Sequence, residues 1–108
     1  MPRLQPGLAR IVSRYREQLV RMGIRPERVL LFGSHAKGIT RPGSDIDLVV
    51  VSPDFAPLNM RERLEALGVA AARIMEPIQA YGVTPDEVQQ RTVSTFLLHV
   101  LEHEAVAV

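Results

Sequence analysis

The chain has 108 residues, a length that suits a single domain over residues 1–108 with its own hydrophobic core. Its 13 basic and 12 acidic side chains give a formal net charge of +1, so no overall field favours nucleic acid or a membrane surface. The absence of cysteine excludes disulfides, thiolate metal sites and cysteine nucleophiles. Neither a signal peptide nor a long apolar span is apparent, and we therefore expect a cytoplasmic protein.

The N-terminal segment is predicted to form an amphipathic helix from Leu8 to Met22, because its apolar residues recur at helical spacing. The arginines of this segment fall largely on the other faces, which is typical of a helix that covers a sheet. Gly23 is expected to end the helix, and Pro26 to mark the turn into the first strand.

The next stretch holds the residues that carry chemistry. The short apolar run from Val29 to Phe32 predicts a buried strand, followed by a Gly33-Ser34 turn that can open into a helix near His35. A second strand is predicted over Ile46–Val51, with Asp45 and Asp47 at its beginning. Side chains two residues apart in a strand project to the same side, so we expect the two carboxylates to lie together.

These two features together predict a nucleotide site. A glycine lets the backbone approach a ligand closely, and the amides of a helix N-terminus favour an anion. Mg²⁺ commonly binds one or two carboxylates together with substrate phosphates. A Gly-Ser turn or a D-x-D motif alone is a weak signal, but the two in adjacent strands indicate a site for a nucleoside triphosphate and Mg²⁺.

In these motifs the chain resembles the minimal nucleotidyltransferases (MNT) of the DNA polymerase β-like superfamily. The matching residues are those of GSHAKG (Gly33, Ser34, Ala36, Gly38), Arg41-Pro42 and SDIDL (Ser44 to Leu48). The resemblance implies an α/β (α+β) domain, with a mixed sheet and helices packed on one side. It also implies transfer of a nucleoside monophosphate, usually from ATP, to a hydroxyl acceptor with release of pyrophosphate.

The resemblance also assigns roles to residues. Asp45 and Asp47 would be the catalytic metal ligands, while Gly33 and Ser34 would cradle the phosphates. The remaining nucleotide-binding candidates are Lys37, Arg41 and Ser44. The alternative interpretation of Lys37 and Arg41 is that they are solvated surface charges without a role in binding. Small members of this family often pair with a separately encoded helical HEPN-type protein as its antitoxin, so the resemblance suggests such a partner.

The second half of the chain is expected to hold further helices and a third strand. Asn59 and Glu62 form a capping box at the start of a helix, and Thr84 and Glu87 form another. A strand is predicted over 78–83 and a last helix from about Thr95 toward Ala105. The apolar stripe expected to bury the first of these helices consists of Met60, Leu64, Leu67, Ala71 and Ile74, with Arg61 and Glu65 pairing outside.

The third strand departs from the family pattern. The family carries an aspartate in P-h-D-h-h-h-h-T-P, where h is apolar, and Pro77 to Pro85 align with this pattern without a gap. Gln79 stands at the position of the aspartate. An amide can offer a carbonyl oxygen to a metal, but it carries no charge and cannot take a proton. The alternative function is therefore a catalytically degenerate domain that binds nucleotide and a partner.

The last predicted helix contains two further signals. His99, Glu102 and His103 fit the H-x-x-E-H zinc-protease pattern, which we reject because the short remaining chain holds no clear third ligand. Apolar residues in this helix and after it exceed one buried stripe, which leaves a surface for a protein partner or a second copy. The small number of aromatic residues (two Tyr, three Phe, no Trp) and the near-neutral charge argue against nucleic acid.

Overall fold

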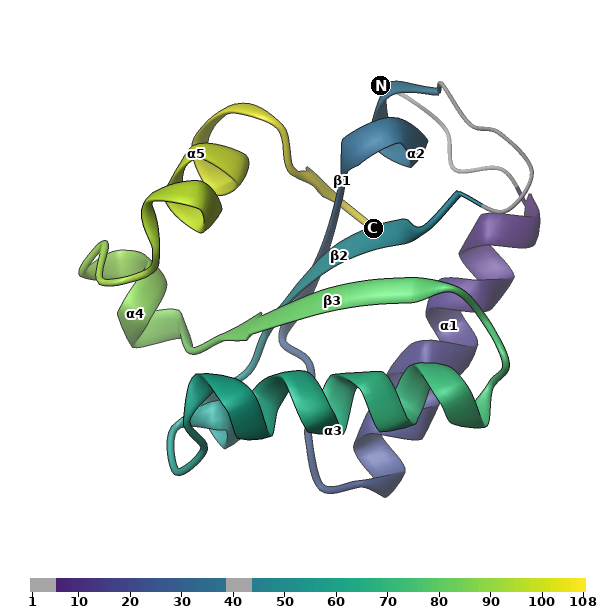
Figure 1. Ribbon diagram of the computed structural model, residues 1–108, viewed down its shortest axis with the longest axis horizontal. Helices are drawn as coiled ribbons and strands as arrows, with labels where there is room; N and C mark the ends of the chain where they lie inside the picture. Colours follow the sequence, from purple (N-terminus) through teal and green to yellow (C-terminus); the bar gives the residue numbers. More distant parts are fainter. Residues whose placement is uncertain (1–5, 39–43) are drawn as a thin grey trace.

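The computed structural model describes residues 6–38 and 44–108. In these ranges a four-stranded sheet has the order β3-β2-β1-β4 (Figure 1). Strand β1 (Arg28–Phe32) is antiparallel to β2 (Ile46–Val51) and to the short β4 (Val106–Ala107), whereas β3 (Ile78–Val83) is parallel to β2. The predicted mixed sheet is confirmed. None of the helices in the described part of the chain is long and apolar enough to cross a membrane.

Helices α1 (Pro6–Arg21) and α3 (Met60–Arg73) cover one face of the sheet (Figure 1). The predicted stripe of α1 is confirmed, with Val12, Tyr15 and Leu19 buried. The Tyr15 hydroxyl donates a hydrogen bond of 2.8 Å to the carbonyl oxygen of Leu67 and thereby links the two helices. Burial raises the pKa of Tyr15, so this hydroxyl keeps its proton.

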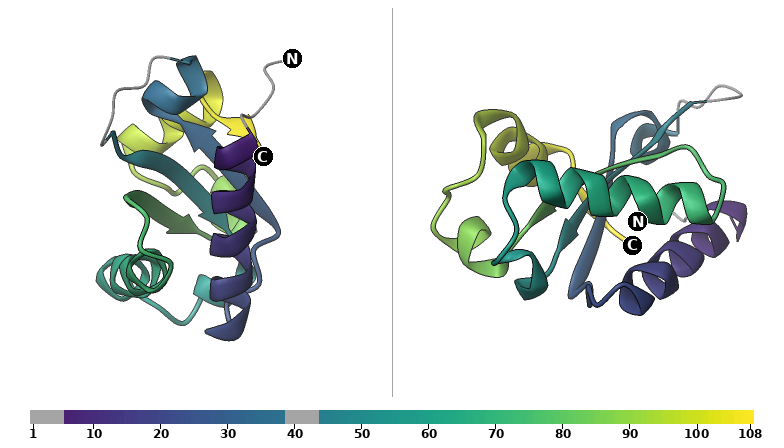
Figure 2. Two further views of the ribbon diagram at one scale, coloured as in Figure 1. Left: turned by 90° about the vertical axis from the view of Figure 1, so that its right-hand side faces the viewer. Right: turned by 60° about the horizontal axis from the view of Figure 1, so that its bottom comes forward.

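The opposite face of the sheet is covered by α5 (Thr95–His103), which follows α4 (Pro85–Gln89), as the two views of Figure 2 show. Leu97 and Val100 of α5 are buried against side chains of β1, β2 and β3. The expectation of helices on one side only is therefore wrong. The strands also carry buried apolar side chains toward this side (Leu30, Phe32, Val49, Val51 and Val83), and α5 shields this second apolar cluster from water.

Most element boundaries agree with the sequence prediction, including β2, β3 and both capping boxes. The last helix is shorter than expected and ends at His103. The chain then turns back, and Val106 and Ala107 pair with Leu31 and Leu30 of β1. This pairing satisfies backbone groups on the outer edge of β1, which a longer helix would leave exposed.

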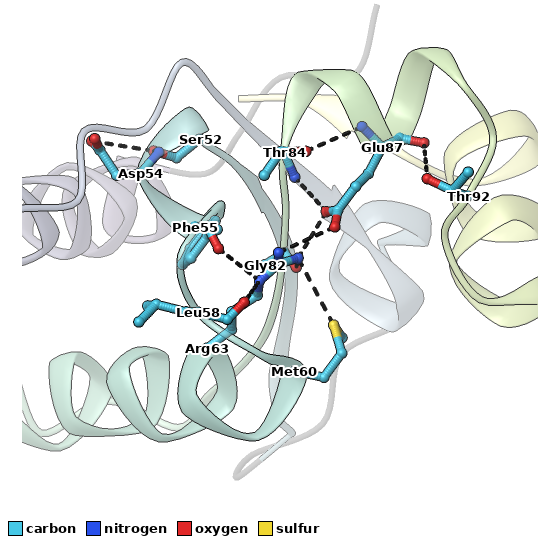
Figure 3. A network of polar contacts seen from close by, with 10 residues as sticks. All are labelled: Ser52, Asp54, Phe55, Leu58, Met60, Arg63, Gly82, Thr84, Glu87 and Thr92. Atoms are coloured by element: carbon cyan, nitrogen blue, oxygen red, sulfur yellow. Dashed lines mark hydrogen bonds and ion pairs between the residues drawn. The ribbon is translucent and has the colours of Figure 1, made fainter.

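The predicted apolar stripe of α3 is wrong over its first two turns. Met60 and Leu64 are 46% and 44% exposed, whereas Arg63 is only 5% exposed. Figure 3 shows the reason, since the Arg63 guanidinium donates to the carbonyl oxygens of Phe55, Leu58 and Gly82 and to the carboxylate of Glu87. These carbonyls belong to the 3-10 helix η1 (Pro53–Phe55), the following loop and β3. A planar group with five N–H donors can satisfy them together, which an apolar side chain cannot.

Candidate functional site

Asp47 and Gly33 form the centre of the candidate site. Asp47 is the second residue of β2 and pairs with Phe32, the last residue of β1. Gly33 follows with φ +73° and begins helix α2 (Gly33–Lys37). A Cβ atom at Gly33 would overlap Asp47 Oδ2 and lie 3.2 Å from Asp47 Cγ. The Asp47 carboxylate thus lies against the backbone where α2 begins, a placement and a φ that glycine permits.

The first of the two predicted carboxylates, Asp45, acts on the second, Asp47. Asp45 is exposed just before β2, and Asp47 is partly buried. Burial raises the pKa of Asp47, the negative charge of Asp45 raises it further, and His35 acts in the opposite direction. Two like charges near one another, with one of them partly removed from water, form a place where a cation would be stabilised.

Gln79 lies beside Asp47. The parallel register of β2 and β3 pairs Asp47 with Gln79, and paired residues project to the same side of a sheet. Gln79 is exposed, so its amide can reach a ligand in front of the sheet. The structure therefore places the amide next to the carboxylate, in agreement with the gap-free match of Pro77 to Pro85.

Two of the acids near Gln79 and β2 in the sequence, Asp54 and Glu76, have partners elsewhere. Asp54 accepts a hydrogen bond of 2.9 Å from the backbone N–H of Arg25, and this bond lowers the pKa of Asp54. Glu76 pairs with Arg14 at 3.5 Å. Neither carboxylate takes the role that Gln79 cannot perform.

The candidates for phosphate contacts differ in their surroundings. Ser34 is partly buried in α2, and Ser44 is partly buried just before Asp45. Lys37, at the end of α2, lies with Nζ 3.7 Å from Glu104 Oε1 at the end of α5. A ligand phosphate would compete with Glu104 for this cation. Arg41 lies outside the described residues.

One residue near the site was not predicted. His35 is the third residue of α2, and its charge acts on Asp47. Its Nδ1 atom is buried and has no hydrogen-bond partner among the described residues. In the sequence His35 appeared only as the start of a helix, because nothing in GSHAKG shows which side of a single helical turn faces the second strand.

The donor set fits Mg²⁺ in part. Aspartate oxygens are hard ligands of the kind that Mg²⁺ prefers. Burial and the nearby Asp45 carboxylate raise the pKa of Asp47, and a bound cation would favour the charged form of both acids. Among the described residues, no group of three or more His, Cys, Asp or Glu side chains is placed to hold a metal ion. The site thus offers two carboxylates and, from Gln79, one uncharged oxygen.

The H-x-x-E-H stretch is a surface feature. His99, Glu102 and His103 are exposed on α5. His99 Nε2 lies 3.5 Å from Glu104 Oε2, and Glu102 forms an ion pair with Arg91. These side chains pair with neighbouring charges on the surface.

Comparison with known proteins identifies the family of the chain. The nucleotidyltransferase domain family matches residues 12–97, which cover Asp45, Asp47 and most of the fold. No curated protein matches the chain. A crystal structure of a toxin–antitoxin with AMP-PNP is similar over 86% of this chain and 68% of the other, with a TM-score of 0.59 and 23% identity. A protein of Sulfolobus solfataricus classed as a nucleotidyltransferase is similar over 99% and 89%, with a TM-score of 0.54 and 18% identity.

The two structural similarities show the fold, and the family match extends over most of the chain, including both aspartates. The chain belongs to the nucleotidyltransferase domain family.

Proposed function

We propose that the chain is a Mg²⁺-dependent nucleotidyltransferase that moves AMP from ATP to a hydroxyl of a protein or small-molecule acceptor. The observation that carries this proposal is the Asp47 carboxylate, which lies against the Gly33 backbone with Asp45 close enough to raise its pKa. This arrangement supports the proposal because it puts two carboxylates and a glycine turn at the same end of the sheet.

Each residue of the proposed site has its own role. The backbone at Gly33 and Ser34 binds phosphate oxygens, and Asp45 and Asp47 hold the metal. When bound, Mg²⁺ neutralises phosphate charge and orients the triphosphate for in-line displacement. The acceptor oxygen forms a bond to the α-phosphorus, the bond from that phosphorus to the bridging oxygen breaks, and pyrophosphate leaves. The acceptor hydroxyl gives its proton to solvent water or to an oxygen of the leaving pyrophosphate, because the Gln79 amide cannot accept it.

A second candidate function follows from Gln79 beside Asp47. With an amide in this position, the domain binds Mg²⁺ and ATP but transfers the nucleotide slowly or not at all. It would then act mainly by binding a partner. The two candidates share the nucleotide site and differ only in turnover.

The partner that we propose is a helical HEPN-type protein, with the chain as its antitoxin. The fold similarity to a structure that contains a toxin–antitoxin with AMP-PNP supports both a partner and nucleotide binding. A second copy of the chain is the alternative partner.

The test is binding of ATP with and without Mg²⁺, in the wild type and in the double variant Asp45→Asn, Asp47→Asn. We expect the variant to keep its fold and to lose the Mg²⁺-dependent part of the affinity, since the substitutions remove both ligands and their mutual repulsion. Asp86→Asn, an exposed acid in the first turn of α4, is the control. Equal Mg²⁺ dependence in wild type and double variant would contradict the proposed site.

A further inference from the structure

Three of the aromatic residues of this chain meet beside the candidate site. Phe32 at the end of β1, Tyr81 in β3 and Phe96 in the first turn of α5 form a closed set of ring contacts. The ring centroids are 6.2 Å apart for Phe32 and Tyr81, 6.1 Å for Phe32 and Phe96, and 5.7 Å for Tyr81 and Phe96. Both contacts of Phe96 are edge-to-face, the geometry that aromatic pairs prefer. We call Phe32, Tyr81 and Phe96 the aromatic triad.

The register of the sheet puts the triad on the side of the carboxylates. Phe32 pairs directly with Asp47, so both side chains project to the same face. Tyr81 is two residues beyond Gln79 in β3 and projects to that face as well. Because Phe96 touches a ring on β1 and a ring on β3, it lies over β2, the strand that carries Asp47.

The members of the triad differ in exposure. Phe32 is buried and Tyr81 is partly buried, whereas 53% of Phe96 is exposed. The other two aromatic residues, Tyr15 and Phe55, are fully buried in the core. Among the Phe and Tyr rings of the described residues, Phe96 is therefore the one that offers a large open surface, and it packs on two further rings.

We propose that Phe96, supported by Phe32 and Tyr81, is the stacking surface for the base of the nucleoside triphosphate. This inference rests on the proposed function, since the phosphates must sit at Gly33 and the aspartates. Phe32 is the residue directly before Gly33 in the chain, so a base bound over the triad lies next to phosphates bound at the α2 turn. Stacking would cover apolar ring surface that now faces water.

A stacking surface of this kind provides affinity for any base, because every base has a π-face. Removing an aromatic stacking partner typically costs a factor of about 5 to 100 in affinity, and for a ring that is half exposed we expect roughly 5- to 30-fold. Phosphate binding is expected to be unaffected, because it depends on the α2 turn and the carboxylates.

The experiment compares Mg²⁺-ATP with Mg²⁺-tripolyphosphate, which has the phosphates and no base. Phe96→Ala should weaken Mg²⁺-ATP binding roughly 5- to 30-fold and leave tripolyphosphate binding unchanged. Phe96→Trp should retain ATP binding, and ATP should quench the fluorescence of its indole, which would be the only tryptophan in a sequence that has none. Leu64→Ala is the control, because Leu64 is 44% exposed on α3, which covers the other face of the sheet.

Each other outcome overturns the inference. Unchanged ATP affinity in Phe96→Ala, with both ligands bound by the wild type, would place the base elsewhere and leave the proposed function intact. Equal losses for ATP and tripolyphosphate would show that Phe96 supports the fold of the site and does not stack on the base. Normal ATP affinity with a loss of partner binding would make Phe96 part of a protein interface. If the wild type binds neither ATP nor tripolyphosphate, both the proposed stacking surface and the proposed function are contradicted.

Discussion

Asp47 of β2 and Gln79 of β3 are directly paired in the parallel register of the sheet. The pair sets a carboxylate and an amide side by side at the end of the sheet where Gly33 begins α2. Within the proposed site, Gln79 is the one side chain whose chemistry opposes turnover, because it can coordinate a metal but cannot take a proton.

The first prediction is that Gln79→Asp raises nucleotidyl transfer. Loss of a general base typically costs about 10²- to 10⁴-fold in rate, and restoring a carboxylate next to Asp47 should recover part of this factor. The measurement is transfer of labelled nucleotide to a partner protein, with wild type and variant side by side. Since a third carboxylate also adds repulsion, the variant should gain more thermal stability from Mg²⁺ than the wild type does.

Gln79→Asn is the matched control for this prediction. It keeps the amide and shortens the side chain to the length of aspartate, so it should not increase transfer. A wild type that is already fully active, and that gains nothing from Gln79→Asp, would show that another group completes the site.

The second prediction concerns Gly33. Gly33→Ala should abolish Mg²⁺-dependent ATP binding, because its Cβ would overlap Asp47 Oδ2 and displace the carboxylate. The positive φ at this position adds backbone strain of roughly 1–2 kcal/mol. Binding is measured by calorimetry and stability by thermal unfolding.

Gly23→Ala separates the two effects of the Gly33 substitution. Gly23 also has a positive φ, +86°, and no atom of the described residues lies within 4 Å of its added Cβ. It should therefore lose a similar amount of stability, roughly 1–2 kcal/mol, and bind ATP normally. If Gly33→Ala binds ATP as well as Gly23→Ala does, the α2 turn is not the phosphate site.

The sequence predicted the elements well because their signals are local. Capping boxes at Asn59 and Thr84 and the apolar runs of β2 and β3 fix helix starts and strands within a few residues. The burial of Arg63 is not predicted by such local signals. Its burial depends on carbonyls at the end of β3 and near η1, which become neighbours only when the chain has folded.

The residues of the candidate site also divide into those that local sequence predicts and those that only the folded chain brings together. The paired aspartates and the Gly-Ser turn could be found from spacing, because alternation along one strand and one turn carries the information. The aromatic triad could not, since Phe32, Tyr81 and Phe96 are far apart in the sequence and meet only through the strand order. The contact of Lys37 with Glu104 likewise depends on the return of the chain toward β1 after α5.

The third prediction concerns the ion pair of Lys37 with Glu104. If Lys37 binds phosphate, Glu104→Gln should tighten Mg²⁺-ATP binding by a factor of about 2 to 5. The substitution removes a competitor from a partly exposed ion pair, which contributes less than about 1 kcal/mol. Lys37→Gln should weaken binding. Glu102→Gln is the control, since Glu102 is an acid at the same end of α5 that pairs with Arg91. Unchanged ATP affinity in both Glu104→Gln and Lys37→Gln would show that Lys37 does not bind the phosphates.

The last prediction concerns the pH dependence of stability at Arg63 and Glu87. Arg63 Nη1 lies 2.7 Å from Glu87 Oε1, and its Nη2 donates to Oε2 at 3.1 Å. The hydrogen bonds from Arg63 lower the pKa of Glu87 below its ordinary value of 4.5, against the effect of burial, which raises it. The stabilisation is therefore fully present above pH 4.5 and is lost as the pH falls through the lower folded pKa.

Glu87→Gln should accordingly cost about 1–3 kcal/mol near pH 7, since it leaves the buried Arg63 charge without its anion. The cost should shrink as the pH falls below 4.5, where the wild type loses the same interaction. Glu65→Gln is the control: Glu65 pairs with Arg61 at 3.1 Å on the exposed side of the same helix as Arg63, and its loss should change stability by less than about 0.5 kcal/mol. Chemical denaturation from pH 3 to 7 measures both variants. A Glu87→Gln penalty that is the same at every pH would show that the ion pair does not stabilise this corner of the fold.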